Sequence, residues 1–143
     1  MENQYTVGFA FSPDKTKVAL ILKKRPRWQR GLLNGIGGKK EEKESFYKCI
    51  SREFEQEAGV HTDDWSPFCE MNFNDSYTQV IFYLTFMDLS KVKTQTDEKV
   101  GIFLVSEINK LKVVPDLKWL IPMALNYEKS LFYYVINIKS IKY

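Results

Sequence analysis

The sequence predicts an α/β or α+β domain built around one mixed sheet that is covered on both faces. Short apolar runs of strand length are interrupted by two stretches with helical periodicity, which is the pattern of this class. The 143 residues suit one domain, and no linker, repeat or low-complexity stretch divides residues 1–143. Apolar residues make up 44% and charged residues 27%, a composition that excludes disordered, fibrous and collagen-like chains.

The first half of the chain is predicted to contain a hairpin and a helix. Residues 5–11 and 18–22 are apolar and β-rich, and a turn cluster separates them. The basic, glycine-bearing segment 23–40 follows, with no element assigned to it. Residues 45–58 carry apolar side chains at helical spacing, and Gly59 is expected to end this helix.

The second half is predicted to complete the sheet and to add a second helix. Asp116, which follows a proline, is expected to cap that helix at its start. In chain order the elements are strands at 65–73, 77–87 and 100–105, one or two helical turns at 106–111, a helix from Asp116 to about residue 126, and a strand or strand-like tail at 131–141.

Charge and composition give little support to a macromolecular or membrane partner. Lys and Arg number 21 against 18 for Asp and Glu, and the resulting net charge of +3 is too mild to imply nucleic acid. The first residues are polar, and no run approaches the roughly 20 apolar residues that span a bilayer. Cys49 and Cys69 are expected to be free thiols. We therefore expect a cytoplasmic protein, as a monomer or homodimer, with no membrane contact.

The helix at 45–58 places two carboxylates beside its apolar stripe. Phe46 and Phe54 lie on the core face, and at about 100° per residue Glu53 and Glu57 fall within about 20° of Phe46. Acidic residues on a helix usually form a solvated face, but these two point inward, where like charges repel. A divalent cation relieves that repulsion, and carboxylate oxygens suit Mg²⁺. The adjacent pair at residues 37–38 supplies a tight glycine turn where backbone can approach a ligand.

The spacing around this helix resembles the Nudix box, Gly-x5-Glu-x7-Arg-Glu-U-x-Glu-Glu-x-Gly-U, where U is a bulky apolar residue. The matching positions are Gly38, Glu44, Arg52, Glu53, Phe54, Glu57, Gly59 and Val60. Gln56 departs from the pattern, because it stands where the box has the first glutamate of its pair. The resemblance implies a Nudix-type α/β/α sandwich that hydrolyses a nucleoside diphosphate linked to another group.

The resemblance also implies a metal site. In the family the glutamates that match Glu53 and Glu57 hold metal, together with the backbone carbonyl at the position of Gly37. The implied cation is Mg²⁺, with Mn²⁺ as an alternative. Gln56 keeps one oxygen but loses the charge of the family's glutamate, so weaker binding of a second metal is expected here rather than loss of activity.

Other residues are expected to support the reaction by positioning groups or moving a proton. Arg52 would orient Glu53 through a charge-assisted hydrogen bond, and Glu44 would support the loop before the helix. The family often takes its general base from a glutamate well downstream of the box, and Glu98 occupies such a place. An exposed loop acid is the alternative for Glu98, and Glu53 is the competing base.

Two further segments are similar to the oxidised-purine nucleoside triphosphatases, relatives of the MutT enzymes. There, residues matching Asn34 and Asp116 read the purine edge, and Lys23 lies in a basic cluster that could meet the triphosphate. Val114 and Leu117 depart from that subfamily, which has a tryptophan and a second aspartate at these places. The resemblance implies Mg²⁺-dependent hydrolysis of a purine dNTP, with 8-oxo-dGTP as one candidate, to monophosphate and pyrophosphate.

Three alternatives remain open from the sequence. Tyr77 lies about where dinucleoside polyphosphate hydrolases carry a tyrosine, which would indicate that substrate or another nucleoside-diphosphate-X compound. Gln56 invites a non-catalytic nucleotide-binding Nudix module. Trp28 between Arg27 and Arg30 could contact single-stranded nucleic acid, although a nucleotide pocket explains the same residues. We expect a small-molecule nucleotide as the partner and no nucleic acid.

Overall fold

The computed structural model describes residues 2–127 and 132–139 of the chain. Its described strands are β1 (Asn3–Phe11), β2 (Lys17–Leu22), β3 (Leu33–Asn34), β4 (Ile36–Lys39), β5 (Ser66–Phe73), β6 (Thr78–Phe86), β7 (Val100–Leu104) and β8 (Tyr134–Ile138). They form one mixed sheet with the order β3-β2-β1-β6-β5-β8, while β4 also pairs with β1 and β7 with β2. The pairs β1–β6 and β5–β8 are parallel and the others antiparallel.

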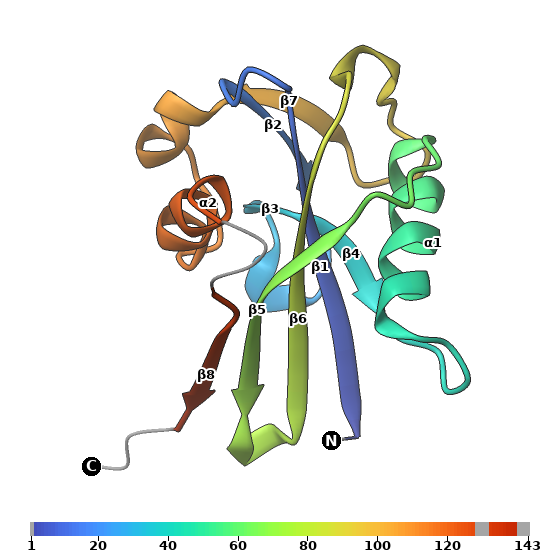
Figure 1. Cartoon of the computed structure of the whole chain (residues 1–143), viewed down its shortest axis with the longest axis vertical. Coiled ribbons are helices and arrows are strands. Elements are labelled where there is room, and N and C mark those ends of the chain that lie inside the picture. Colours follow the sequence, from blue (N-terminus) through green and yellow to red (C-terminus); the bar gives the residue numbers. More distant parts are fainter. Residues whose placement is uncertain (1, 128–131, 140–143) are drawn as a thin grey trace.

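One helix covers each face of the sheet, so the predicted sandwich is confirmed (Figure 1). Helix α1 (Phe46–Ala58) packs Ile50 and Phe54 into an apolar cluster with β-strand residues on one face. Helix α2 (Leu117–Leu125) packs Leu120 and Ile121 into the larger cluster on the other face. Each helix buries an apolar stripe against the sheet, which is the main source of stability for such amphipathic elements.

Most of the predicted elements are present with small shifts in their ends. Ser45 accepts a hydrogen bond from the Lys48 N–H and caps α1, and Gly59 ends the helix at φ 75°, a conformation that favours glycine. The helical turns expected near 106–111 form a 3₁₀ helix at Val105–Lys110. The last strand covers Tyr134–Ile138, while residues 131, 140 and 141 of the predicted tail lie outside the described part of the chain.

Two features differ from the sequence prediction. The unassigned segment 23–40 contains β3 and β4 and a short 3₁₀ helix at Arg27–Gln29. Asp116 is the N-cap residue of α2 as predicted, although its side chain makes no capping hydrogen bond. Cys49 and Cys69 are buried free thiols, as predicted. Among the described residues, no helix has the length and apolarity needed to cross a membrane.

Candidate active site

Helix α1 presents Glu53 to the glycine pair on β4. A Cβ atom at Gly38 would lie 2.5 Å from the Glu53 carboxyl carbon and within 2.7 Å of both its oxygens. Residue 38 must therefore lack a side chain if the carboxylate is to rest against the backbone. Strand β4 is held in this place by antiparallel pairing with β1, where Gly38 lies opposite Thr6. The structure thus brings the predicted acidic helix face against the glycine pair, but this pair lies within strand β4 and not in the tight turn that the sequence predicted.

Arg52 joins the Glu53 carboxylate to acceptor groups on Glu44, Lys39 and Gln56. Its Nε and Nη2 donate to the two Glu44 oxygens at 2.6 and 2.9 Å, and its Nη1 donates to Glu53 Oε1 at 2.9 Å. Nη2 also donates to the Lys39 carbonyl oxygen at 3.1 Å, and Nη1 to Gln56 Oε1 at 3.2 Å. The bidentate contact from Arg52 lowers the pKa of Glu44 to about 2. Arg52 therefore fixes the orientation of Glu53, in the geometry expected from the sequence.

Glu57, one helical turn beyond Glu53, carries a buried oxygen without a partner. Its Oε2 atom has no hydrogen-bond partner among the described residues and almost no contact with solvent. Burial raises the pKa of Glu57 to about 7, and the negative charge of Glu53 adds to this shift. The positive charge of Lys23 and the backbone N–H of Gly37 act in the opposite direction. A cation would give this buried acceptor a partner and would offset the repulsion between the two carboxylates.

The donors present fit a hard cation that is only partly held by the protein. No group of three or more His, Cys, Asp or Glu side chains in the described chain has the spacing of a complete metal cage. Glu53 and Glu57 supply carboxylate oxygens, and the backbone N–H of Gly37 bonds to Glu57, which brings the β4 backbone to the same place. Mg²⁺ keeps several waters and binds through one or two carboxylates plus substrate phosphates, which matches this sparse set.

We expect the Mg²⁺ affinity of the protein to rise as the pH rises through about 7, because Glu57 must lose its proton to act as a ligand. Without a cation, the raised pKa means that the folded state binds more protons than the unfolded state between about pH 4.5 and 7. Stability of the metal-free protein should therefore fall across that window. Thermal unfolding at pH 5.5, 7 and 8.5, with and without Mg²⁺, measures both effects. A Mg²⁺-induced rise in Tm that is equal at all three values would contradict the prediction.

Glu98 lies next to this site but is fully engaged. Its Oε2 accepts the backbone N–H groups of Lys24 and Arg25 at 2.6 and 3.3 Å, and its Oε1 pairs with Lys23 Nζ at 3.4 Å. Although burial acts to raise it, these contacts hold the pKa of Glu98 below its ordinary value. Asp97 adds an ion pair with Arg25. Glu98 is thus no exposed loop acid: it ties the basic segment after β2 to the loop before β7.

The predicted base-reading residues lie at one end of two neighbouring segments. Leu33 forms a parallel bridge with Val113, and the N–H of Val114 donates to the Leu33 carbonyl oxygen at 2.9 Å. Asn34 directly follows Leu33, and Asp116 comes two residues after Val114. Because the two segments run parallel, both residues lie toward the same end of the pair. Burial raises the pKa of Asp116, and its carboxylate is not used as a helix cap. Both side chains are half-buried, so each can still reach a ligand.

Gln29 is a further residue of this region: its Oε1 accepts the side-chain N–H of Asn34 at 3.0 Å. No pattern in the sequence indicates this contact, because it depends on the path of the segment after β2. Trp28, beside it, is 67% exposed. Tyr77 is 65% exposed in the turn between β5 and β6.

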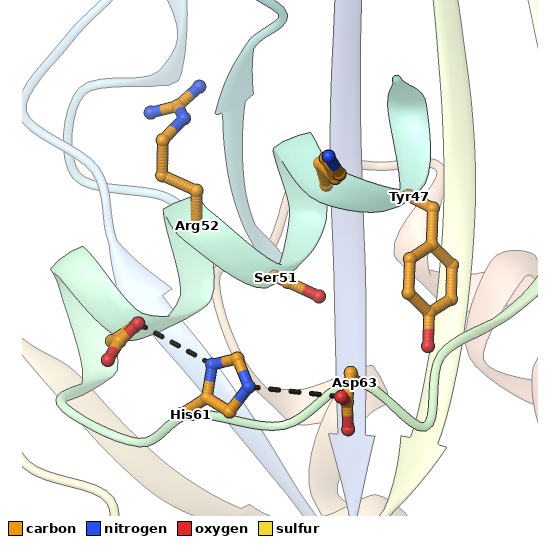
Figure 2. Close-up of a pocket in the computed structure, with 7 residues that line it drawn as sticks. Tyr47, Ser51, Arg52, His61 and Asp63 are labelled. Atoms are coloured by element: carbon orange, nitrogen blue, oxygen red, sulfur yellow. Dashed lines mark ion pairs between the residues drawn. The ribbon is translucent and has the colours of Figure 1, made fainter. Parts of the chain in front are cut away.

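A pocket of about 410 Å³ lies against α1 (Figure 2), and neither Glu53 nor Glu57 is among the described residues that line it. Tyr47 and Ser51 line it from the helix, and His61 and Asp63 from the segment that follows. His61 lies between the carboxylates of Glu55 and Asp63, at 3.6 and 3.9 Å. The Arg52 guanidinium points away from His61 in Figure 2, as its hydrogen bonds to Glu44 and Glu53 require. Arg52 also lines this pocket, so the pocket meets the carboxylate cluster through that residue.

The NUDIX domain model matches residues 2–124, which is most of the chain. The chain belongs to the Nudix family. Nudix hydrolases generally cleave pyrophosphate linkages with the help of a divalent cation, and the arrangement of Glu53, Glu57 and Arg52 around the glycine pair is consistent with that chemistry. A search of curated proteins finds no match to the Nudix chain.

Solved Nudix structures share this fold at low sequence identity. MutT, from a study of the Aliivibrio salmonicida and Vibrio cholerae proteins, is 16% identical with a TM-score of 0.72, over 88% of this chain and 98% of that chain. A MutT protein from Bacillus halodurans is 18% identical with a TM-score of 0.72, over 96% and 90%. The NUDIX domain of Shewanella oneidensis NrtR, solved with ADP ribose, is 18% identical with a TM-score of 0.73, over 85% of each chain. These likenesses support the fold and leave the substrate open.

Proposed function

We propose that this Nudix chain hydrolyses a purine nucleoside triphosphate to the monophosphate and pyrophosphate, with Mg²⁺ as its cation and Mn²⁺ as a substitute. The observation that carries the proposal is the unpartnered, buried oxygen of Glu57 beside the Glu53 carboxylate. Two carboxylates kept this close, in a family of pyrophosphate-cleaving enzymes, serve a cation and the phosphates that it binds.

Glu53, Glu57 and the backbone carbonyl of Gly37 are the groups that would hold the cation, and Gln56 lies at the exposed side of this set. The bound cation would neutralise phosphate charge and lower the pKa of a coordinated water. The amide oxygen of Gln56 accepts a hydrogen bond from Arg52, so it helps to orient the guanidinium and is not free to bind the cation. We therefore propose that Gln56 is compatible with catalysis.

The chain's own residues would position the substrate and move one proton. Lys23 lies close enough to Glu57 to lower its pKa and can donate to a phosphate oxygen. Asn34 and Asp116 would contact the purine edge, where an amide offers both a donor and an acceptor. Water would attack the α-phosphorus, forming one P–O bond while the bond to pyrophosphate breaks. The water's proton would pass to a carboxylate, either Glu53 or, once Lys23 turns to the phosphates, Glu98 Oε1.

Product analysis on a nucleotide panel tests this proposal. The panel contains the four dNTPs, 8-oxo-dGTP, 2-hydroxy-dATP, diadenosine polyphosphates and ADP ribose, each with and without Mg²⁺. We expect monophosphate and pyrophosphate from at least one purine dNTP, and only with the cation. Turnover of dinucleotides or ADP ribose alone would replace the proposed substrate. Tight binding of a nucleotide without any turnover would favour a non-catalytic binding module.

A further inference from the structure

The hydrogen bonds around Asn34 determine which atoms of two side-chain amides face a ligand. The backbone N–H of Gly35 can only donate, and it lies 2.7 Å from one atom of the Asn34 amide, which must therefore be the oxygen. The other atom of that amide is then the NH₂ group, and it donates to Gln29 at 3.0 Å. Gln29 must in turn present its oxygen to Asn34, so its own NH₂ group points elsewhere.

Gln29 is held in this position by the backbone. Its N–H donates to the Pro26 carbonyl oxygen and its carbonyl accepts from the Leu32 N–H, both at 2.9 Å. Two backbone hydrogen bonds hold the ends of the segment 23–32 together. The Lys23 N–H donates to the Leu32 carbonyl oxygen, and the Lys23 carbonyl oxygen accepts from the Gly31 N–H. The Gln29 amide nitrogen itself has no hydrogen-bond partner within the described part of the chain. It is a half-buried donor group fixed beside Asn34.

We propose that Gln29 is a specificity-determining residue that makes this site prefer purines with an oxygen at position 6 over purines with an amino group there. The inference rests on the proposed function, which places a purine at Asn34. One N–H of Asn34 and the NH₂ of Gln29 remain free, so the pair offers two neighbouring donors. A 6-oxopurine that is not oxidised at C8 presents acceptors at both N7 and O6, whereas adenine presents one acceptor and one amino donor. The second arrangement leaves two donors facing each other and a polar group unpaired.

The test compares the α,β-imido triphosphates of deoxyinosine and deoxyadenosine, which resist hydrolysis at the α,β linkage. Deoxyinosine has the 6-oxo group without the 2-amino group of guanine, so the comparison isolates the edge that Gln29 would contact. Binding is measured by calorimetry with Mg²⁺ for the wild type, Gln29→Leu and Gln29→Glu. Arg27→Leu is the matched control, because Arg27 is exposed on the same short helix and its side chain has no hydrogen bond or ion pair within residues 2–127 and 132–139.

We expect the wild type and Arg27→Leu to bind the deoxyinosine analogue about tenfold more tightly than the deoxyadenosine analogue. Gln29→Leu should bring that ratio close to one. Gln29→Glu keeps an oxygen for Asn34 but replaces the free donor by an acceptor, so it should reverse the ratio in favour of deoxyadenosine. If Gln29 only supported Asn34, Gln29→Glu would retain the wild-type ratio, and that result would overturn the proposal.

A wild type without preference between the two analogues, or without binding to either, would also overturn it. Thermal unfolding of each variant reports whether the fold is intact, and Gln29→Glu keeps the contact to Asn34 if Gln29→Leu proves unstable. The proposed function fails separately: if the analogues bind with the expected ratio but dITP and dGTP are not cleaved with Mg²⁺, the chain selects 6-oxopurines without hydrolysing them.

Discussion

Glu57→Gln is expected to lower kcat/KM on the preferred nucleotide by a factor on the order of 10²–10³ while the protein remains folded. The amide keeps the size of the side chain but cannot supply a negative oxygen to the cation. The same change should stabilise the metal-free protein, because it removes a buried charge whose pKa is raised to about 7 by burial and by Glu53. Loss of activity combined with a higher Tm without metal is a result that simple misfolding does not produce.

Steady-state kinetics and thermal unfolding at pH 8, with and without Mg²⁺, measure both effects. Glu55→Gln is the matched control, since Glu55 lies on the same helix and is exposed, and among the described residues its carboxylate pairs with His61 alone, at 3.6 Å. That control should keep nearly all the activity and the full Mg²⁺-induced rise in Tm. A Glu57→Gln protein that turns over at a rate comparable with the wild type would exclude Glu57 from the metal site.

Helix α1 and its acidic face could be predicted because the signals are local. Apolar spacing, a serine at the start and Gly59 at the end act within a few turns, and the structure places the helix ends where these residues stand. Strands β3 and β4 were not predicted, since they have only two and four residues and the middle of β4 is a pair of glycines. Their pairing with β2 and β1 comes from contacts distant in sequence, which short-range alternation does not reveal.

The candidate site likewise contains contacts that the sequence indicated and contacts that it did not. The Nudix resemblance implied that Glu53 shares a site with the glycine pair, and the Glu53 carboxylate does lie against Gly38. It also implied the hydrogen bond from Arg52 to Glu53, which is present at 2.9 Å. The glycine pair itself forms part of strand β4 and not the expected turn. Asp116 is the N-cap residue of α2 as predicted, but the first two N–H groups of the helix donate to the backbone carbonyls of Val114 and Pro115 and not to its side chain. The engagement of Glu98 with the backbone after β2 depends on how two loops approach each other. No sequence pattern encodes such a loop–loop distance.

Arg52→Ala is expected to have the largest effect on stability among single changes near the site. The substitution leaves Glu44 and Glu53 without the guanidinium that joins them, and their side chains are only 10% and 15% exposed. We expect a loss of about 2–3 kcal/mol, below the range for a fully buried pair because Arg52 retains some solvent contact. Activity should fall as well, since Glu53 loses the hydrogen bond that orients it. Arg52→Lys is the conservative variant, and it keeps the charge but cannot make the bidentate contact.

The pH dependence of stability separates this ion pair from simple loss of packing. The pKa of Glu44 is about 2 in the folded protein against an ordinary value of 4.5, so its contribution is complete above about pH 4.5 and is lost as the pH falls toward 2. Urea unfolding at pH 7, 5 and 3 should show a gap between wild type and Arg52→Ala that narrows at pH 3, because protonated Glu44 no longer needs its partner. A gap of constant size at all three values would mean that Arg52 acts through its alkyl chain, and that Glu53 is held at the glycine pair by other contacts.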